Sequence, residues 1–514
     1  MTFYQIEVPL AQAIAECRTK VRVRVSFDFT GTGEFVSIPD CDILELTVTS
    51  RKEAAGGTST DALLVLENAT SAYCPRLFDT YRPEYKKYNG LLQDGGLGNL
   101  RPGRKVEISY TTGRDNPFVK RFVLYVDDSG FQQTATGYSG RVCSVRLVDL
   151  SDKLKKTDRH KDWNNPEVLV HNTVCTKEFP VSSLVHRIAS RAGLRVHDID
   201  CSTISDYLPY VKLTRSVWDE LSDIAFVYNA HLETAIEKPL VFVDSVDPVQ
   251  YTFDNSNVTH IRSYDLVGQY RNTIRMKWTR YREFADRELW RYGDPPVLYD
   301  AALTPSYPFS ANGCKRAIEE PGYIAPFRID EGNGKTVPVV YAEDVDTEAM
   351  FATRISTDGS ALRIVHYDGS SSRDHAEIQL AADSDTLLTA ASIRGNAIAG
   401  EQNFCCYLCD DFEVAQRGTA AEHVTTPYLS DSMHGGKPYY LLFAEKLLAK
   451  LKRFRKGYFV TTNRPVFHAR VGAAVRIQLG DGLETGRAQI VRMELRYHER
   501  KAFTASFTLE EDET

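Results

Sequence analysis

The cysteines of Cys405-Cys-Tyr-Leu-Cys come closest, by type and spacing, to a set of metal ligands. Zinc is bound by thiolate and imidazole ligands, most often four of them at a structural site. No second pair of Cys or His residues lies nearby in the sequence, and small cysteines are often buried with no chemical role. We therefore predict no metal and no cofactor, and keep Cys405, Cys406 and Cys409 as the candidates for a zinc site.

Other reactive residue types do not form a recognisable catalytic set. His231 and Glu233 share one face of a predicted strand, but the sequence suggests no third partner for them. Gly95-Gly-Leu-Gly does not connect a strand to a helix, as a dinucleotide site requires, and is predicted to be a flexible loop. The pair Asp127-Asp128 precedes Ser-Gly and is typical of a turn. A glycosidase needs two carboxylates brought together by the fold, and nothing suggests such a pair, so we expect no enzymatic activity.

A long stretch from Tyr73 to Asn99 is rich in Tyr and Gly, and it interleaves aromatic with basic residues. A loop of this length inside a compact domain is usually functional or part of an interface. Its aromatic rings could stack on bases or sugars, but Tyr and Arg are also enriched in protein interfaces. We favour a protein interface, with the candidate residues Tyr81, Arg82, Tyr85 and Tyr88.

A basic amphipathic helix is predicted from Pro438 to Lys456. Apolar residues recur there every three or four positions, and lysines and arginines fill the other face. Such a helix can lie on a membrane surface. Cations at its end also suit the helix dipole, which favours a docked helix with a solvated basic face. The candidate interface residues on this face are Lys446, Lys450, Arg453 and Lys456.

Length and charge narrow the class of protein. A chain of 514 residues is expected to form three or four domains. No window approaches the roughly 18–20 apolar residues of a spanning helix, and the start at Met1 lacks the pattern of a secretory signal. We therefore expect synthesis in the cytoplasm, with reduced cysteines. A net charge of −7 argues against a dedicated nucleic-acid binder.

Alternating strands dominate the first 155 residues. Lys20-Val-Arg-Val-Arg-Val-Ser-Phe-Asp-Phe places Val and Phe on one face. Further strands are predicted at Ile43, Ala62, Val106, Phe122 and Val142. Without a long helix to cover them, these strands are most simply buried in a closed or nearly closed antiparallel barrel. We predict a first barrel domain over residues 1–155.

A small α+β domain is predicted over residues 156–250. One amphipathic helix follows Pro180 and ends near Gly193, and a second begins at a capping Ser216 with acidic residues in its first turn. A hairpin from His231 closes the unit.

The rest of the chain predicts a second barrel interrupted by an insertion. Strands at Val258 and Tyr270 open it, and three strands near the C-terminus complete it, which gives a domain of residues 251–330 and 426–514. Residues 331–425 are predicted to form an inserted β domain. The fold class is thus α+β and mainly β. A faint repeat relates Arg104-Lys-Val-Glu-Ile to Val475-Arg-Ile-Gln-Leu, which suggests the same element in both barrels.

The order of these pieces resembles the baseplate-hub or tail-hub proteins of long-tailed phages and related injection machines. The matching pieces are Leu100-Arg-Pro-Gly-Arg-Lys-Val, Leu147-Val-Asp-Leu-Ser-Asp-Lys-Leu, the helix after Pro180, and Ser216-Val-Trp-Asp-Glu-Leu-Ser-Asp-Ile-Ala with the hairpin that follows it. They cover roughly residues 20–290 and 440–510.

The resemblance implies a homotrimer at the virion tail tip, in which two barrels per chain build a ring that continues a six-fold tail tube. Expected partners are a tail tube or distal tail protein, a tape-measure protein, and a central spike or fibre protein. DNA or another cargo would pass through the lumen without specific binding, and an acidic wall would let phosphate slide. The alternative is a tail-tip protein that binds glycan or degrades cell wall through residues 331–425.

Overall fold

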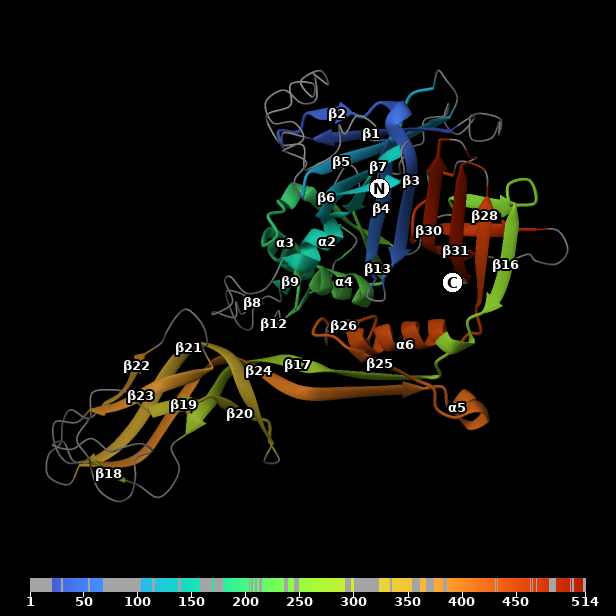
Figure 1. Ribbon diagram of the computed structural model, residues 1–514. Coiled ribbons are helices and arrows are strands. Elements are labelled where there is room, and N and C mark those ends of the chain that lie inside the picture. Colours follow the sequence, from blue (N-terminus) through green and yellow to red (C-terminus); the bar gives the residue numbers. More distant parts are fainter. Residues whose placement is uncertain are drawn as a thin grey trace, which may run out of the picture.

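The protein is mainly β and has three parts: a large sheet, a small α+β layer and an elongated β arm (Figure 1). The computed structural model describes residues 21–28, 31–53, 56–67, 103–112, 116–136, 140–157, 169–170, 179–202, 204, 207–208, 210–211, 215–234, 239–244, 249–291, 297–299, 323–332, 335–353, 361–366, 374–381, 386–429, 431, 433–462, 464, 466–467, 469–479, 487–499, 501 and 503–511. Within them lie five α-helices.

The largest element is a 13-stranded sheet that contains both ends of the described chain. Its strands follow the order β16-β28-β31-β30-β3-β4-β7-β6-β5-β1-β2, and β29 lies between β30 and β15. The bounds are β1 (Val21–Asp28), β2 (Phe35–Ser37), β3 (Ile43–Lys52), β4 (Thr58–Glu67), β5 (Lys105–Thr112), β6 (Val119–Thr136), β7 (Gly140–Val148), β15 (Tyr251–Asp254), β16 (His260–Asp265), β28 (Lys456–Thr462), β29 (Ala474–Gln478), β30 (Ala488–His498) and β31 (Thr504–Glu511).

This sheet contains the same six-stranded arrangement twice. In the first unit the pairing order is β3-β4-β7-β6-β5-β1, and in the second unit it is β16-β28-β31-β30-β29-β15. Each strand holds the same place in chain order in the two units. Only the last pair differs in direction, because β1 runs antiparallel to β5 whereas β15 runs parallel to β29. The strands that the faint sequence repeat relates, β5 and β29, thus occupy equivalent positions in the two units.

The alternating sequence explains why these strands form and which face they bury. In β1 the side chains of Val21, Val23, Val25 and Phe27 are buried, as the pattern predicts. In the equivalent strands β5 and β29, the residues Val106, Ile108, Val475 and Ile477 are fully buried in the same way.

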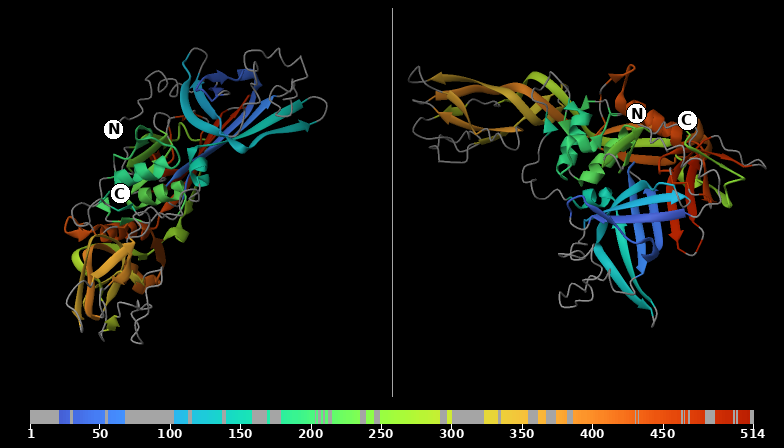
Figure 2. Two further views of the ribbon diagram at one scale, coloured as in Figure 1. Left: turned by 90° about the vertical axis from the view of Figure 1, so that its left-hand side faces the viewer. Right: turned by 90° about the horizontal axis from the view of Figure 1, so that it is seen from above.

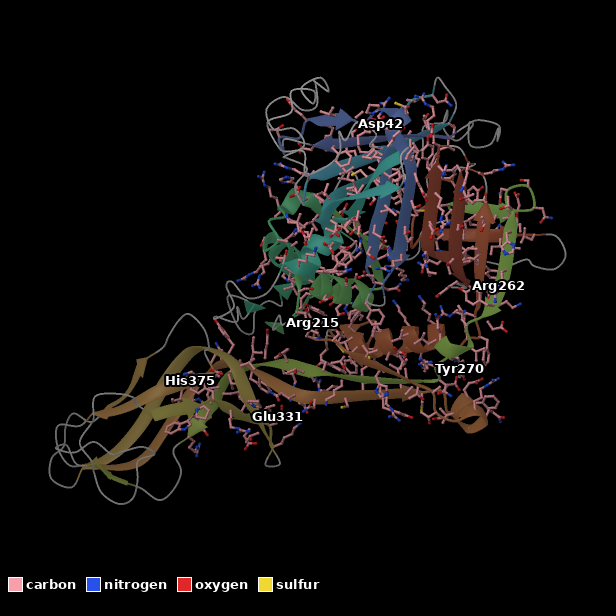
Figure 3. The ribbon with its side chains drawn as sticks, viewed as in Figure 1. Asp42, Arg215, Arg262, Tyr270, Glu331 and His375 are labelled. Carbon is pink, nitrogen blue, oxygen red and sulfur yellow. The ribbon has the colours of Figure 1, made fainter. Side chains whose placement is uncertain are left out.

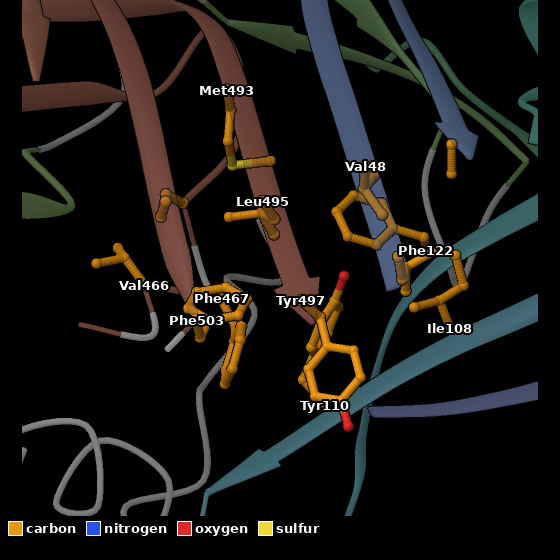
Figure 4. Close-up of a cluster of buried hydrophobic side chains, with 14 of the residues drawn as sticks. Val48, Ile108, Tyr110, Phe122, Val466, Phe467, Met493, Leu495, Tyr497 and Phe503 are labelled. Atoms are coloured by element: carbon orange, nitrogen blue, oxygen red, sulfur yellow. The ribbon is translucent and has the colours of Figure 1, made fainter. Parts of the chain in front are cut away.

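The two units share one hydrophobic core. They join through β3 and β30, which pair antiparallel from Glu45 opposite His498 to Arg51 opposite Arg492. Behind this join, Tyr110 of the first unit stacks on Phe467 of the second, with ring centroids 4.6 Å apart, and Phe503 packs edge-on against both (Figure 4). The two halves of the sheet therefore fold against each other rather than as separate bodies.

The prediction of closed barrels is not met by the described strands. Neither unit closes on itself in that part of the chain, because no pairing joins β3 to β1 or β16 to β15. The physical reason is visible at the join: the edge of β3 that would close the first unit is hydrogen-bonded to β30 of the second.

A small α+β layer covers one end of the sheet. Its helices are α2 (Leu150–Lys156), α3 (Val181–Ser190) and α4 (Val217–Val227), beside a sheet of β10 (Ile199–Asp200), β14 (Leu240–Asp244) and β13 (Ala230–Glu233). Ser216 caps α4 by accepting a hydrogen bond from the N–H of Asp219 at 3.2 Å. Short strand pairs lie beside it: β8 (Leu169–Val170) with β12 (Tyr210–Val211), and β9 (Phe179–Pro180) with β11 (Tyr207–Leu208).

Helix α4 packs closely on the large sheet through Trp218. Its indole N–H donates to Glu53 at 2.8 Å, and the ring leaves no room for a side chain at Gly57, where a Cβ atom would lie 2.6 Å from Trp218. The glycine therefore allows the helix to approach the strand.

The third part is an elongated β arm that projects away from the body (Figure 1). It is built mainly from three long strands, β17 (Thr273–Arg291), β21 (Thr336–Thr353) and β24 (Thr386–Cys409). The remaining elements are β18 (Val297–Tyr299), β19 (Tyr323–Pro326), β20 (Arg328–Asp330), β22 (Ala361–His366), β23 (His375–Ala381), α5 (Asp411–Arg417), β25 (Ala421–Thr425), β26 (Met433–His434), β27 (Lys437–Pro438) and α6 (Tyr439–Leu451).

One strand expected in the second barrel belongs to this arm. The sequence pattern predicts that the stretch after Tyr270 helps to open the second barrel, but β17 pairs with β24 and β25. The reason is that its apolar residues Ile274, Met276 and Trp278 pack in the core beneath α4 and α6, and not in the core of the large sheet. The arm sheet therefore begins at Thr273, ahead of residue 331.

Candidate interaction surfaces

The three candidate cysteines do not converge. They lie on β24, where successive side chains point to opposite faces, so Cys405 and Cys409 share one face and Cys406 lies on the other. The Cys405 thiol donates to the carbonyl of Asn403 at 3.2 Å, and the Cys409 thiol donates to Asp411 at 3.0 Å. Across the described residues, no group of three His, Cys, Asp or Glu side chains is placed to hold a metal ion.

The environment of two of these thiols, Cys406 and Cys409, favours the protonated form. The hydrogen bond to Asp411 raises the pKa of Cys409, and burial raises the pKa of Cys406. A metal ligand must be a thiolate. The structure therefore gives Cys406 a packing role, beside Phe404 and Leu408 in the core under α6.

His231 and Glu233 are buried where three parts of the molecule meet. His231 on β13 forms a hydrogen bond with the hydroxyl of Thr58 on β4, and Glu233 accepts one from Arg470 at 2.9 Å. Gly472 lies against the imidazole, where a Cβ atom would come within 2.7 Å of the ring. The pair that shares a strand face thus ties the α+β layer to both units of the large sheet.

The buried histidine predicts a loss of stability in acid. Burial, together with the positive charges of Lys52 and Arg470, lowers the pKa of His231 to about 3. An unfolded histidine titrates near pH 6.5, so only the unfolded chain gains this proton as the pH falls below that value. Between pH 7 and pH 5 we expect the wild type to lose about 2 kcal/mol more free energy of unfolding than a His231→Gln variant. Urea unfolding at both pH values measures this, and equal losses in the two proteins would contradict it.

A buried polar network joins α4 to the segment before α6. Glu220 accepts the backbone N–H of Arg215 at 2.8 Å and the hydroxyl of Tyr428, and it is 1% exposed. The Arg215 guanidinium also pairs with Asp223 on the next turn of α4. Figure 3 shows Arg215 between the α+β layer and the arm. Burial and the negative charge of Glu220 raise the pKa of Tyr428.

Sequence reasoning missed this network. It assigned Glu220 to the first turn of α4, where an acidic residue suits the helix dipole. The available signal was the spacing of Glu220, which lies four residues before Ile224 and next to Leu221. This spacing puts the carboxylate on the buried side of the helix. The partner Tyr428 lies 208 residues away, so no local pattern could identify it.

Asp127 and Asp128 lie within a strand and not in a turn. They occupy the middle of β6, where the register with β7 shifts between Val126 and Phe131. Lys156 lies 2.5 Å from the carboxylate of Asp128 and 3.7 Å from that of Asp127. The turn-like composition therefore marks an irregularity in strand β6. The two carboxylates pair with Lys156 at the end of α2.

The basic helix is confirmed but is shorter than predicted. Helix α6 ends at Leu451, and Lys456 begins β28. Its buried side, with Phe443, Ala444 and Leu448, packs on β17 and β24, and no side-chain group caps its N-terminus at Pro438. The early end follows from the chain turning to enter the large sheet, where β28 pairs with β31.

Only part of the expected basic face therefore belongs to this helix. Lys446 and Lys450 lie one turn apart and are exposed, whereas Arg453 and Lys456 are exposed beyond its end. Lys452 is paired with Asp410 at 3.0 Å. The candidate residues Tyr81, Arg82, Tyr85 and Tyr88, like the Gly95 loop, lie outside the described residues.

No helix within the described part of the chain combines the length and apolar character needed to cross a membrane.

Comparison with known proteins finds similarity among solved structures alone. No family model matches the sequence, and no curated protein matches it. A tail protein from Neisseria meningitidis MC58 aligns with a TM-score of 0.44 and 9% identity, over 96% of this chain and 97% of that chain. The 43 kDa tail protein of prophage MuSo2 from Shewanella oneidensis aligns with a TM-score of 0.45 and 9% identity, over 95% and 98%. An E. coli component of the type VI secretion system aligns with a TM-score of 0.34 and 8% identity, over 91% and 73%.

Proposed function

We propose that this chain is a structural component of a phage tail or a related injection machine, and that three copies form its hub. In this role it closes the tail tube, adapts the six-fold tube to a three-fold tip, and surrounds the channel for DNA or other cargo. It acts as scaffold and not as an enzyme.

The observation that carries this proposal is the duplicated unit in the large sheet. The two six-stranded units meet through different edges. The second strand of the first unit, β3, pairs with the fifth strand of the second unit, β30. Such a head-to-tail contact uses different surfaces on its two sides, and repetition of it generates a ring when the rotation closes. Three chains with two units each would supply six wall segments, which matches the symmetry of the tube that the sequence resemblance implies.

The exposed face of the join carries both positive and negative side chains. Glu494 on β30 pairs with both Arg492 and Arg496, so one carboxylate partly offsets the charge of two cations on this strand. Direct phosphate binding requires clustered, available Lys and Arg side chains. We infer that cargo DNA passes without specific recognition.

The β arm is the natural contact for neighbouring tail proteins, because it extends away from both units (Figure 1). The exposed lysines of α6, Lys446 and Lys450, lie at its base. We propose that this region contacts an adjoining component such as the tape-measure, spike or distal tail protein.

Microscopy of the purified chain and of tails from the producing cells tests the proposal. We expect mass photometry to give a species of three times 57.9 kDa, and negative-stain images to show a ring with six lobes. Gold-labelled antibody should mark the tail tip. A monomer at every concentration that is also absent from purified tails would overturn the proposal, and specific binding to cell-wall glycan by that monomer would favour the alternative role of the inserted domain.

A further inference from the structure

Strand β16 is an edge of the large sheet with an exposed surface. It pairs with β28 on one side, and within the described residues no strand lies on its other side. Its side chains are exposed except for the half-buried Ile261. Figure 3 shows Arg262 at this outer edge. An unpaired edge of this kind is a template for pairing with another chain.

A second edge lies on the outer half of β6. Residues 131–136 pair with β7, whereas β5 pairs only with the part of β6 that ends at Tyr125. Figure 2 shows β6 and β7 extending together beyond the rest of the sheet. The backbone of residues 131–136 therefore has one described partner strand, and its other side is an edge.

These two edges are the counterparts of the strands that join the units. In the second unit, the strand equivalent to β6 is β30, and its outer half is covered by β3. The second-unit strand equivalent to β3 is β16. The contact inside the chain thus leaves one β3-like edge and one β30-like edge that are not joined by any described pairing.

The residues that lie opposite one another on neighbouring strands show which residues of the two units are equivalent. In the first unit, Thr49 lies opposite Asp61, which lies opposite Val148, which lies opposite Tyr125. In the second unit, the same path runs through the residues Tyr264, Gly457, Glu510 and Gln489. The register with the neighbouring strand shifts directly after Val126 in β6 and directly after Ile490 in β30, which makes Tyr125 equivalent to Gln489. Thr49 is therefore equivalent to Tyr264, and Ser50 to Asp265.

The outer halves of the two long strands are matched in the same way. Phe131 lies opposite Val145, three residues before Val148, and Met493 lies opposite Phe507, three residues before Glu510. Phe131 is thus equivalent to Met493, which pairs with Ser50 at the join. The matching places Asp265 opposite Phe131, Arg262 opposite Thr134, and His260 opposite Thr136.

We propose that β16 of one copy pairs antiparallel with residues 131–136 of the next copy in this register. The contact repeats between chains the β3–β30 ladder that the structure contains within one chain. It rests on the proposed function only for the number of copies in the ring. The partner is a second copy because both sides of the ladder have a counterpart inside this chain.

The residue types of the two edges are compatible with this register. The segment Phe-Gln-Gln-Thr-Ala-Thr at 131–136 carries no charge, whereas β16 contains Arg262, Asp265 and one histidine. No pair of like charges is therefore placed directly opposite, an arrangement that would weaken a ladder. Ile261, which packs against the core of the sheet, would lie opposite Ala135, as Leu46 lies opposite Tyr497 in the internal join.

Disulfide trapping tests the register in the full-length chain. One preparation carries Arg262→Cys and a second carries Thr134→Cys, and the two are mixed and mildly oxidised. Directly opposed residues lie about 4.5–5.5 Å apart, which is within the Cα separation of a disulfide. We expect a covalent dimer whose linked peptides join positions 262 and 134, identified by mass spectrometry.

The matched control shifts the register by one residue. Gln133→Cys replaces Thr134→Cys, so that the two thiols face opposite sides of the ladder. We expect at least a tenfold lower yield from this pair. Because the natural chain has ten cysteines, the unsubstituted protein supplies the background. Equal yields from the two pairs would overturn the proposal.

Charge reversal provides a measurement that does not depend on thiols. Thr134→Lys places a like charge opposite Arg262, and we expect the dissociation constant of the oligomer to rise about fivefold. Adding Arg262→Glu should restore it. A ring that forms normally but shows neither the disulfide nor this rescue would overturn the ladder and leave the proposed function standing. A chain absent from tails would instead overturn the proposed function, whatever the cross-linking result.

Discussion

Replacing Leu495 by alanine is expected to lower the free energy of unfolding by about 3 kcal/mol. Leu495 lies on β30 opposite Val48 of β3, at the join between the two units, and both side chains are fully buried (Figure 4). The substitution removes buried methyl groups and leaves a cavity where the units share their core. Urea unfolding followed by circular dichroism measures the change.

Leu63 supplies the matched control for this prediction. It is also a leucine on a strand of the same sheet, but its side chain is 47% exposed. Leu63→Ala should change the free energy of unfolding by less than about 0.5 kcal/mol. Similar losses of free energy of unfolding in the two variants would show that side chains at the join do not contribute to a shared core. A transition of Leu495→Ala in two separate steps would show that the units unfold independently, contrary to their common packing.

The second large effect is expected at Glu220. Glu220→Ala should cost about 3 kcal/mol, because it leaves Tyr428 and the backbone N–H of Arg215 buried without their acceptor. Arg215 keeps its pairing with Asp223, which limits the loss. Glu220→Gln preserves the shape and an acceptor oxygen, so we expect a smaller loss than for alanine. Chemical denaturation of both variants separates the effect of charge from that of hydrogen bonding.

A double-mutant cycle with Tyr428→Phe isolates the contact between α4 and the segment before α6. The single change Tyr428→Phe should cost about 1.5 kcal/mol, since it removes a hydrogen bond to a charged group. In the double variant with Glu220→Ala we expect a total loss at least about 1 kcal/mol below the sum of the single losses. Strict additivity would mean that the two side chains do not interact in solution.

Local patterns were sufficient to predict most strands of the large sheet and the cap of α4. The alternation of β1, the capping of α4 by Ser216 and the hairpin of β13 and β14 all depend on residues close together in sequence. The repeat that relates β5 to β29 was also visible, because equivalent buried positions require equivalent apolar spacing.

Pairing between distant strands could not be predicted in the same way. The pattern of β17 indicates a strand, but it does not indicate that its neighbours are β24 and β25. The same holds for the end of α6, where the basic composition continues past Leu451 although the chain has already turned toward β28. An alternating strand can pair with any edge that presents a matching apolar face.

The amino-acid sequence alone therefore establishes a mainly β chain with two related strand sets, a small helical layer and no evident catalytic residues. The fold determines that the two sets share one open sheet and that Glu220 and His231 are buried at its junctions. It also determines that Cys405 and Cys406 lie on opposite faces of one strand. The physical reason is that burial faces follow from local periodicity, whereas the choice of partner depends on which edges remain unpaired after the whole chain has folded.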